Sequence, residues 1–314
     1  MLPLESVPNV SEGRDPSVVA AIADAFVSAG ARVIDTHLDG DHHRTVVTLV
    51  GDDGALEDGL VAGVEQARHR IDLRTHDGVH PRVGAADVVP LVPLGAGDLS
   101  RCVAVAHEVG RRVGEEIGLP VFLYGVIGEG RRPAFFRRGG PEELQRRIDS
   151  SELAPAYGPR QLDPRAGAVL VGVRRPLLAY NIELLGTLEA AREVAQAVRE
   201  SSGGLPGVQA LGLRLWGGAV QISTNVIDLD ATAPHVMVER IATEAAARGA
   251  GVGRGELVGL VPAASVARAA RAAGVQSPLD HRGVPIPAAL EAAARALHLE
   301  ALDVDRVLEW HLTL

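Results

Sequence analysis

The chain has 314 residues, which at roughly 150 residues per domain predicts two domains. Hydrophobic residues make up 46% and charged residues 23%, a balance typical of a folded soluble protein rather than a disordered one. The formal net charge of -9 argues against nucleic-acid binding, because a polyanion would be repelled. No apolar run approaches the roughly 20 residues that span a membrane. The start of the sequence also lacks the basic end and apolar stretch of a signal peptide, so we expect a cytoplasmic protein with no membrane partner.

All 31 positively charged side chains are arginine, since the sequence contains no lysine. This excludes Schiff-base chemistry on a lysine and the phosphate loop that ends in Gly-Lys. The single cysteine, Cys102, excludes a disulfide framework, and its apolar neighbours predict a buried thiol.

The first half of the chain predicts an alternation of strands and helices. The predicted strands are residues 4–10, 31–37, 44–50, 85–94 and 120–124, and the predicted helices are residues 16–29, 54–71 and 98–117. Asp15 followed by Pro16 is a typical helix start, and Gly30 a typical helix end. Residues 125–168 are rich in glycine and arginine and predict a linker or substrate loop rather than core.

The second half repeats this order of elements. Predicted strands cover residues 177–183, 208–216, 219–226 and 251–260; Thr187 caps one predicted helix and Pro234 opens another. Alanine-rich helices are predicted after Pro262, with residues 274–287 as a loop between them. We therefore predict an α/β protein, an α+β sandwich of two tandem ferredoxin-like βαββαβ subdomains with helices on the outer faces, covering residues 1–175 and 176–314.

Two polar segments of the first half are candidates for chemistry. Histidine, aspartate and arginine gather at Asp35, His37, Asp39, Asp41, His42, His43 and Arg44, and again in residues 76–82 (HDGVHPR). A metal site, acid–base catalysis by one imidazole, and simple solvation of polar loops are all compatible with this composition. For His80, which lies between a glycine turn and Pro81, we favour a functional role.

Several sequence blocks together resemble the glutamate formimidoyltransferase (formiminotransferase) family. They are residues 7–13 (VPNVSEG), 41–46 (DHHRTV), 80–90 (HPRVGAADVVP), 123–125 (LYG), 179–181 (AYN), 199–204 (RESSGG), 221–225 (QISTN) and 255–262 (GELVGLVP). The blocks keep their order and cover most of residues 6–262.

The resemblance implies transfer of a formimidoyl group between N-formimidoyl-L-glutamate and tetrahydrofolate, in histidine breakdown, with tetrahydrofolate as co-substrate. It implies partners that are folate and L-glutamate derivatives, a folate tunnel along the seam of two subdomains, and a homodimer. The family's catalytic histidine falls on His80. Its folate-contacting loop falls on Gly158, Pro159, Arg160, Gln161, Leu162, Asp163, Pro164, Arg165, Ala166 and Gly167.

Transfer between two amines needs a proton shuttle but no covalent nucleophile and no metal. The hypothesis gives the shuttle to His80, with Asp39 or Asp35 orienting it or holding a positive charge. Arg44 and Arg82 would bind the carboxylates of glutamate, because a guanidinium matches two oxygens. Asn225 would reach the site from the second half.

Some positions depart from the family pattern: His43 replaces a usual asparagine, Val10 a usual phenylalanine, and Val126 and Asp163 also differ. Three alternatives therefore stay open. One is a transferase for a formyl group; another is a folate-binding protein without turnover. The third is a metal-dependent hydrolase that uses His37, His42, His43 and Asp41.

Overall fold

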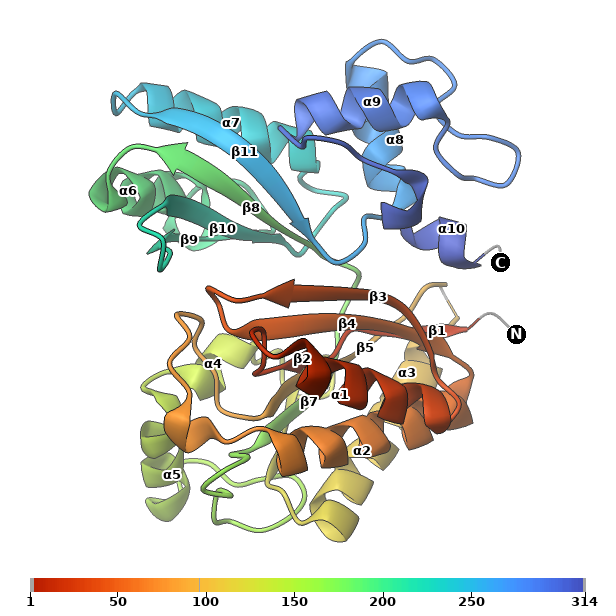
Figure 1. The fold of residues 1–314 in the computed structure, drawn as a ribbon, viewed down its shortest axis with the longest axis vertical. Coiled ribbons are helices and arrows are strands. Elements are labelled where there is room, and N and C mark those ends of the chain that lie inside the picture. The colour runs from red at the N-terminus through yellow and green to blue at the C-terminus, as the bar shows by residue number, and fades with distance from the viewer. Residues whose placement is uncertain (1–2, 96, 313–314) are drawn as a thin grey trace. The chain divides into compact units, whose positions relative to one another are not determined.

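The computed structural model describes residues 3–95 and 97–312 and consists of two compact units. Unit 1 ends at Arg175 and unit 2 begins at Pro176. Each unit has its own β-sheet and its own main hydrophobic core, so the chain is a mixed α/β protein with two sheets (Figure 1). Among the described residues, no helix combines the length and the apolar character needed to cross a membrane.

Unit 1 is a seven-stranded mixed sheet with helices on both faces. Its strands are β1 (Leu4–Ser6), β2 (Asn9–Val10), β3 (Arg32–Asp39), β4 (Arg44–Gly51), β5 (Ala86–Val92), β6 (Val121–Gly125) and β7 (Val169–Val173). Its helices are α1 (Pro16–Ser28), α2 (Asp53–Arg70), α3 (Leu99–Arg112), α4 (Pro133–Arg137) and α5 (Gly140–Asp149), with a short 3-10 helix η1 (Leu73–Thr75) and a π-helix η2 (Val113–Ile117) that follows α3. The pairs β3–β4, β4–β1, β4–β2, β1–β5 and β2–β5 are antiparallel, whereas β5–β7 and β7–β6 are parallel.

The first helix begins where the sequence predicts. The Asp15 side chain accepts a hydrogen bond from the Ser17 amide at 2.8 Å, and Pro16 occupies the first turn, where a missing N–H costs nothing. Gly30 follows the helix with φ of +105°, a conformation that glycine adopts without steric strain.

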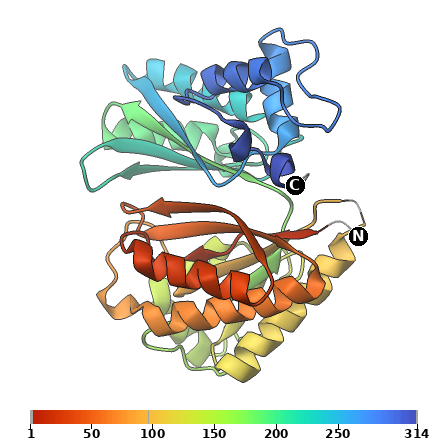
Figure 2. The same cartoon turned by 45° about the vertical axis from the view of Figure 1, so that its right-hand side comes forward.

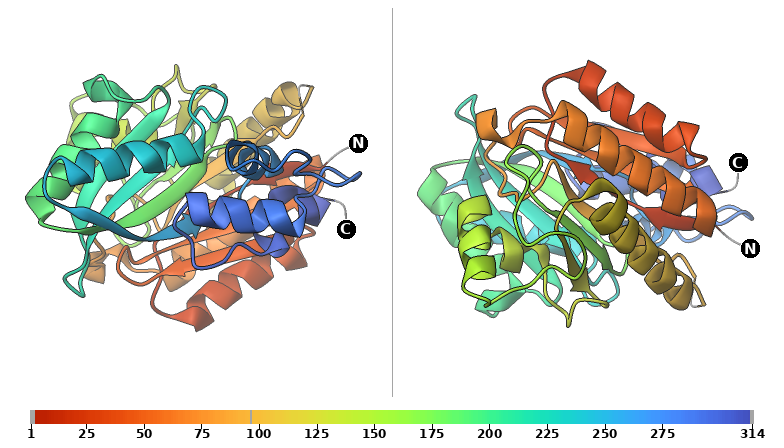
Figure 3. Two further views of the ribbon diagram at one scale, coloured as in Figure 1. Left: turned by 90° about the horizontal axis from the view of Figure 1, so that it is seen from above. Right: turned by 90° about the horizontal axis from the view of Figure 1, so that it is seen from below.

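Side-chain alternation gives the unit 1 sheet two different faces. Val89, Val169 and Val171 belong to the larger core, over which α1, α2 and α3 lie side by side (Figures 2 and 3). Their neighbours Val88 and Leu170 point the other way, into a second cluster shared with α4 and α5. The face opposite α1, α2 and α3 therefore carries its own helices, α4 and α5.

The interpretation of residues 125–168 as a linker or loop is wrong, because α4 and α5 lie there. Leu144 and Ile148 are four residues apart and fully buried, which anchors α5 to the sheet. The many glycines and arginines of this segment made the two apolar positions of α5 difficult to recognise in the sequence. The predicted strand 4–10 is also interrupted, since β1 and β2 are separate strands on either side of Val7 and Pro8. The sequence analysis missed β7, which lies between β5 and β6.

Unit 2 is a four-stranded antiparallel sheet with strand order β11-β8-β10-β9. Its elements are β8 (Leu178–Leu185), α6 (Leu188–Val198), η3 (Glu200–Ser202), β9 (Val208–Arg214), β10 (Val220–Val226), α7 (Pro234–Ala246) and β11 (Gly251–Val258). The predicted cap is present, because Thr187 Oγ1 accepts a hydrogen bond from the Ala190 amide at 3.1 Å. The helices α6 and α7 lie on one face of the sheet (Figure 3).

The predicted alanine-rich tail adds α8 (Ala263–Ala272), α9 (Pro287–Ala296), η4 (Val304–Arg306) and α10 (Leu308–Leu312); the predicted tail's last two residues lie outside the described chain. Tyr180 of β8 is fully buried, and its hydroxyl donates to the Leu297 carbonyl at 2.6 Å. The tail is thus part of the unit 2 core rather than an appendage.

Close packing of α1 against α2 depends on Gly63. A Cβ at this position would lie 2.0 Å from Phe26 Cε1. We expect Gly63→Ala to lower the free energy of unfolding by about 1–3 kcal/mol through overpacking. The matched control is Gly54→Ala in the same helix, where the nearest atom to the new Cβ lies 3.8 Å away. It should be neutral or raise stability by up to about 1 kcal/mol. Urea unfolding measures both, and equal effects would contradict the packing argument.

Candidate active site

The turn between β3 and β4 places a carboxylate against an imidazole. Asp39 ends β3, and its Oδ1 accepts a hydrogen bond from the His42 amide at 2.8 Å. Asp39 Oδ2 contacts Nδ1 of the His42 ring, which is 2% exposed. Burial raises the pKa of Asp39, but the hydrogen bonds from His42 and the charge of Arg44 more than offset this, so the pKa is lowered overall. Asp39 therefore stays a carboxylate that holds the His42 ring.

Arg82 fixes the loop that carries His80. Its guanidinium donates to the carbonyl oxygens of His80 and Gly78 within the loop, at 2.5 and 2.9 Å from Nη2. It also reaches the carbonyls of His42 and His43 in the β3–β4 turn, each at 3.2 Å. One side chain thus joins two loops that are far apart in sequence. As a result the rings of His42 and His80 lie 6.2 Å apart, edge to face.

His80 lies in a strongly cationic environment. Arg44, the first residue of β4, contacts His80 Nε2 through Nη1 at 2.7 Å, so Nε2 accepts and the ring is neutral. Burial and the positive charges of Arg44 and Arg137 hold the pKa of His80 well below its ordinary value of 6.5. Burial also lowers the pKa of Arg44 to about 10, and Arg44 stays charged at neutral pH.

A buried ion pair connects α4 to this loop. Asp87 of β5 accepts hydrogen bonds from the amides of Val83 and Gly84 at 2.7 and 3.2 Å. Its other oxygen accepts from Arg137 Nη2 at 2.5 Å, and the two side chains are only 3% and 14% exposed. The sequence analysis missed Asp87 and gave Arg137 no particular role. The available signal was the single acidic residue inside an apolar strand.

The segment predicted to contact folate, residues 158–167, ends beside the His80 loop. The Ala85 amide donates to the Ala166 carbonyl at 2.8 Å, and the Ala168 amide donates to the Val83 carbonyl at 2.9 Å. Asp163 folds back on its own loop, where it accepts from the amides of residues 165 and 166. The exposed members of the segment are Gly158, Pro159, Arg160, Gln161, Pro164 and Arg165, whereas Leu162, Ala166 and Gly167 are buried.

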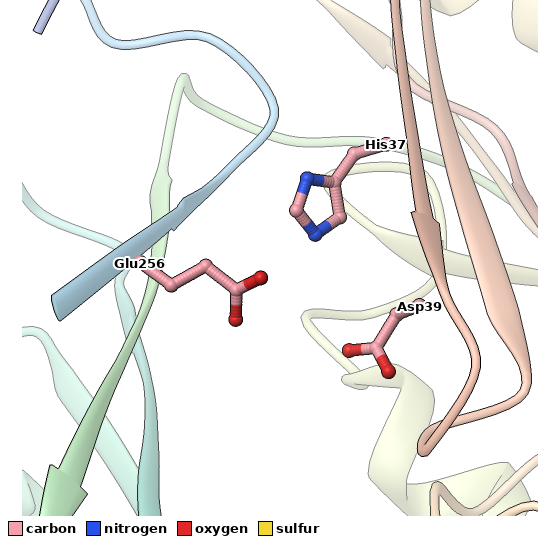
Figure 4. A group of neighbouring side chains, drawn as sticks. All are labelled: His37, Asp39 and Glu256. Atoms are coloured by element: carbon pink, nitrogen blue, oxygen red, sulfur yellow. The ribbon is translucent and has the colours of Figure 1, made fainter. Parts of the chain in front are cut away.

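The other histidines do not gather at one point within unit 1. His43 Nε2 lies 3.1 Å from Glu12 Oε1, and its ring stacks on His76 at 3.9 Å. His37 projects from the same face of β3 as Asp39, two residues away (Figure 4). The nitrogens of His42 and His43 thus turn to different carboxylates, which gives the hypothesis of a metal-dependent hydrolase no support.

Two residues of interest lie in unit 2. Asn225 of β10 is partly buried and pairs in register with Ala179 and Gln209. The side chain of Glu256, on β11, is drawn in Figure 4. It accepts a hydrogen bond from Asn181 Nδ2 at 3.0 Å. The approach of Asn225 to His80 stays a prediction, as does carboxylate binding by Arg44 and Arg82.

Comparison with known proteins places this histidine–arginine site in a family of transferase domains. The N-terminal subdomain model of the formiminotransferase domain matches residues 3–174, and the formiminotransferase domain model matches residues 179–274. The chain therefore belongs to the formiminotransferase family.

The relatives are similar over nearly the same extent. A glutamate formimidoyltransferase of Thermoplasma acidophilum is 38% identical over 82% of this chain and 88% of its own length. The enzyme of that name from Streptococcus pyogenes serotype M1 is 34% identical, over 83% of this chain and 89% of its own. A formimidoyltransferase-cyclodeaminase of Gallus gallus is 38% identical over 82% of this chain, but over only 50% of its own length.

Removal of the Asp87 carboxylate should destabilise unit 1 strongly. Asp87→Ala leaves the guanidinium of Arg137 and two buried amides without their acceptor, and we expect a loss of about 3–5 kcal/mol in the free energy of unfolding. The matched control is Asp58→Ala, which removes an ion pair to Arg112 from a side chain that is 61% exposed. That loss should stay below about 1 kcal/mol. Chemical denaturation distinguishes them, and a loss below about 1 kcal/mol for Asp87→Ala would refute the structural role.

Proposed function

We propose that this protein transfers a formimidoyl group between N-formimidoyl-L-glutamate and tetrahydrofolate, with His80 as general acid and base. The observation that carries the proposal is the contact between Arg44 and His80 Nε2, which keeps an imidazole neutral in a cationic environment. The names of the relatives support the reaction, because two of them are glutamate formimidoyltransferases.

The reaction exchanges one carbon–nitrogen bond for another. An amine nitrogen of tetrahydrofolate attacks the amidine carbon, which becomes tetrahedral and bonded to both nitrogens. The attacking nitrogen loses a proton to His80, and the glutamate nitrogen receives that proton as its bond to carbon breaks. Charge and atoms balance without a metal or a covalent enzyme intermediate, and one imidazole serves both proton transfers.

Arg44 links substrate binding to the basicity of His80. In the structure the Arg44 guanidinium donates a hydrogen bond to the lone pair of His80 Nε2. The same lone pair must be free to take up a proton in the reaction. A carboxylate of the glutamate donor is a stronger acceptor for a guanidinium than a neutral imidazole. When the carboxylate takes Arg44, Nε2 becomes free and the positive charge next to it is neutralised. Both changes increase the basicity of His80 at the moment when the donor is bound.

The remaining assignments rest on sequence resemblance and on the position of the loops. The exposed part of residues 158–167 would bind the pterin or the glutamate tail of folate, since the end of this segment pairs with residues 83–85. Arg82 and Asn225 would take part in substrate binding. We further propose a place in histidine breakdown, a homodimer and a cytoplasmic location.

We also infer that both units derive from one ferredoxin-like βαββαβ pattern. Unit 2 supports this with four strands in the order β11-β8-β10-β9 and two helices in the expected places. In unit 1 the strands β3, β4, β1 with β2, and β5 follow the corresponding order, and β7 and β6 extend the sheet beyond β5.

Loss of the imidazole should remove most of the activity without unfolding the protein. We expect His80→Ala to lower kcat by roughly 10²- to 10⁴-fold, the range typical of general acid–base catalysis. Formation of formimidoyltetrahydrofolate is followed with N-formimidoyl-L-glutamate as donor, and a thermal melt shows that the variant folds. A folded variant that transfers at the wild-type rate would exclude His80 as the shuttle.

The pH dependence of kcat/KM should show how the positive charge of Arg44 affects the pKa of His80. His80 acts as a base only when it is neutral, so the acidic limb of kcat/KM should lie below pH 6.5 in the wild type. Removing a neighbouring cation stabilises the protonated ring and raises its pKa. Arg44→Gln should therefore move the limb upward toward 6.5, whatever its effect on donor affinity. Arg111→Gln, which removes a cation on α3 that pairs with Glu108 of α3 and Glu115 of η2, is the control and should leave the limb in place. A downward shift in Arg44→Gln would contradict the assignment.

A further inference from the structure

A turn from a distant part of the chain holds both ends of the loop that carries His80. Ahead of the loop, the Leu73 amide donates to the Arg165 carbonyl at 2.8 Å. After the loop, the Ala85 amide donates to the Ala166 carbonyl, also at 2.8 Å. The two acceptors belong to consecutive residues. A movement of this turn would therefore move both ends of the His80 loop together.

The turn fits closely against the segment that follows the loop. Gly167 has a φ of +70°, and a Cβ at this position would lie 2.0 Å from the Val83 carbonyl oxygen. The next residue, Ala168, donates its amide to that same carbonyl at 2.9 Å. Val83, Ala85, Ala166 and Ala168 are all buried, so a displaced turn would leave their backbone groups unpaired away from water.

The Asp163 side chain organises this turn. Its Oδ1 accepts hydrogen bonds from the amides of Arg165 and Ala166 at 2.8 and 2.9 Å. The Gly167 amide donates to the Asp163 carbonyl at 2.7 Å. The guanidinium of Arg68, on α2, lies 3.3 Å from Asp163 Oδ2. Burial raises the pKa of this carboxyl, but the two amides and the charge of Arg68 outweigh that effect and lower the pKa overall. Asp163 therefore stays a carboxylate, which one oxygen ties to the turn and the other to α2.

We propose that Asp163 is a positioning residue for His80. The residues whose amides bind the Asp163 carboxylate are the same ones whose carbonyls hold the ends of the loop. Asp163 thus acts through the turn and has no need to touch a substrate, unlike the folate contact that the resemblance implies for it. This inference rests on the proposed function, in which His80 is the proton shuttle. A misplacement of about 1 Å at such a group can cost on the order of 10²-fold in rate.

The first test removes the side-chain acceptor. Asp163→Ala should lower kcat by about 10- to 100-fold and leave the KM of each substrate within about threefold of the wild type. Asp163→Asn should keep kcat within about threefold, because its amide oxygen still accepts from the two backbone amides. A residue that binds folate directly would instead raise the KM of tetrahydrofolate with kcat unchanged. That result would overturn the positioning role.

The matched control is Asp280→Ala in unit 2. Asp280 lies between α8 and α9 and also accepts hydrogen bonds from two amides of its own turn, those of Arg282 and Val284 at 2.9 and 3.0 Å. Its side chain is 25% exposed, against 19% for Asp163. We expect both alanine variants to lower the melting temperature to a similar extent, and only Asp163→Ala to lower kcat. An equal fall in kcat would contradict the positioning role.

The titration of His80 gives a second readout, which needs no transferase activity. The titratable and charged groups that act on the ring are Arg44, Arg137, His42 and Arg82. Burial and these groups hold the pKa of His80 well below 6.5. If Asp163→Ala loosens the base of the loop, the ring gains contact with water and its pKa moves up toward 6.5. The NMR signal of the His80 Cε1–H group, assigned by its loss in His80→Ala, measures this shift, and Asp163→Asn should titrate like the wild type.

The outcomes separate this inference from the proposed function. If the wild type transfers no formimidoyl group, the proposed function fails, and the titration of His80 still tests the role of Asp163. If the wild type transfers it but Asp163→Ala changes neither kcat nor the titration, the proposed function stands and the positioning role is refuted. Should Asp163→Ala not fold, amide hydrogen exchange of the wild type decides. The amides of Leu73, Ala85 and Gly167 should then open together with one free energy, and independent opening would refute the role.

Discussion

The arrangement of the candidate site depends on the guanidinium of Arg82. Residues 76–82 contain two histidines, a glycine and a proline and have no regular structure that would position them. Arg82 supplies the missing constraint, because its five donors satisfy carbonyls of this loop and of the β3–β4 turn together. Lysine has one ammonium group and could not bridge these oxygens in a plane. The use of arginine rather than lysine thus has a structural consequence at this site.

The arginines around the His80 imidazole keep their positive charge, and the carboxylates beside them are held in place by hydrogen bonds. Arg82 and Arg44 are partly buried, and burial lowers the pKa of each to about 10, which leaves both charged. The nearby carboxylates, Asp39 and Asp87, are each held by hydrogen bonds from backbone amides as well as from side chains. The acids are therefore fixed in place, and the cations have few anionic partners within the site. Such an excess of positive charge is suited to a substrate with two carboxylates.

The sequence predicted the strands and helices whose hydrophobic period is clear, such as α1, α2 and most of unit 2. It failed at α5, where the buried positions Leu144 and Ile148 lie among arginines and glutamates, and at β7, a buried strand of only five residues. At the site, His80 and Arg44 were predicted from residue type and resemblance. The contact of Asp39 with His42 is made within the β3–β4 turn, where residue types alone did not show which of several carboxylates and imidazoles meet. The pair of Asp87 and Arg137 depends on tertiary packing between segments 50 residues apart, and no local pattern carries that information.

The two neighbouring histidines of the β3–β4 turn, His42 and His43, have identical side chains but contact different partners. His43 has a φ of +49°, in the left-handed region that asparagine, aspartate and histidine adopt more readily than other residues. Its ring consequently turns toward Glu12 and His76, while His42 faces Asp39 and His80. Histidine at position 43 therefore satisfies a backbone requirement of the turn, as would the asparagine that the resemblance leads us to expect there. It leaves the contacts of His80 with Arg44 and of His42 with Asp39 as they are, so this substitution by itself gives no reason to expect a loss of turnover.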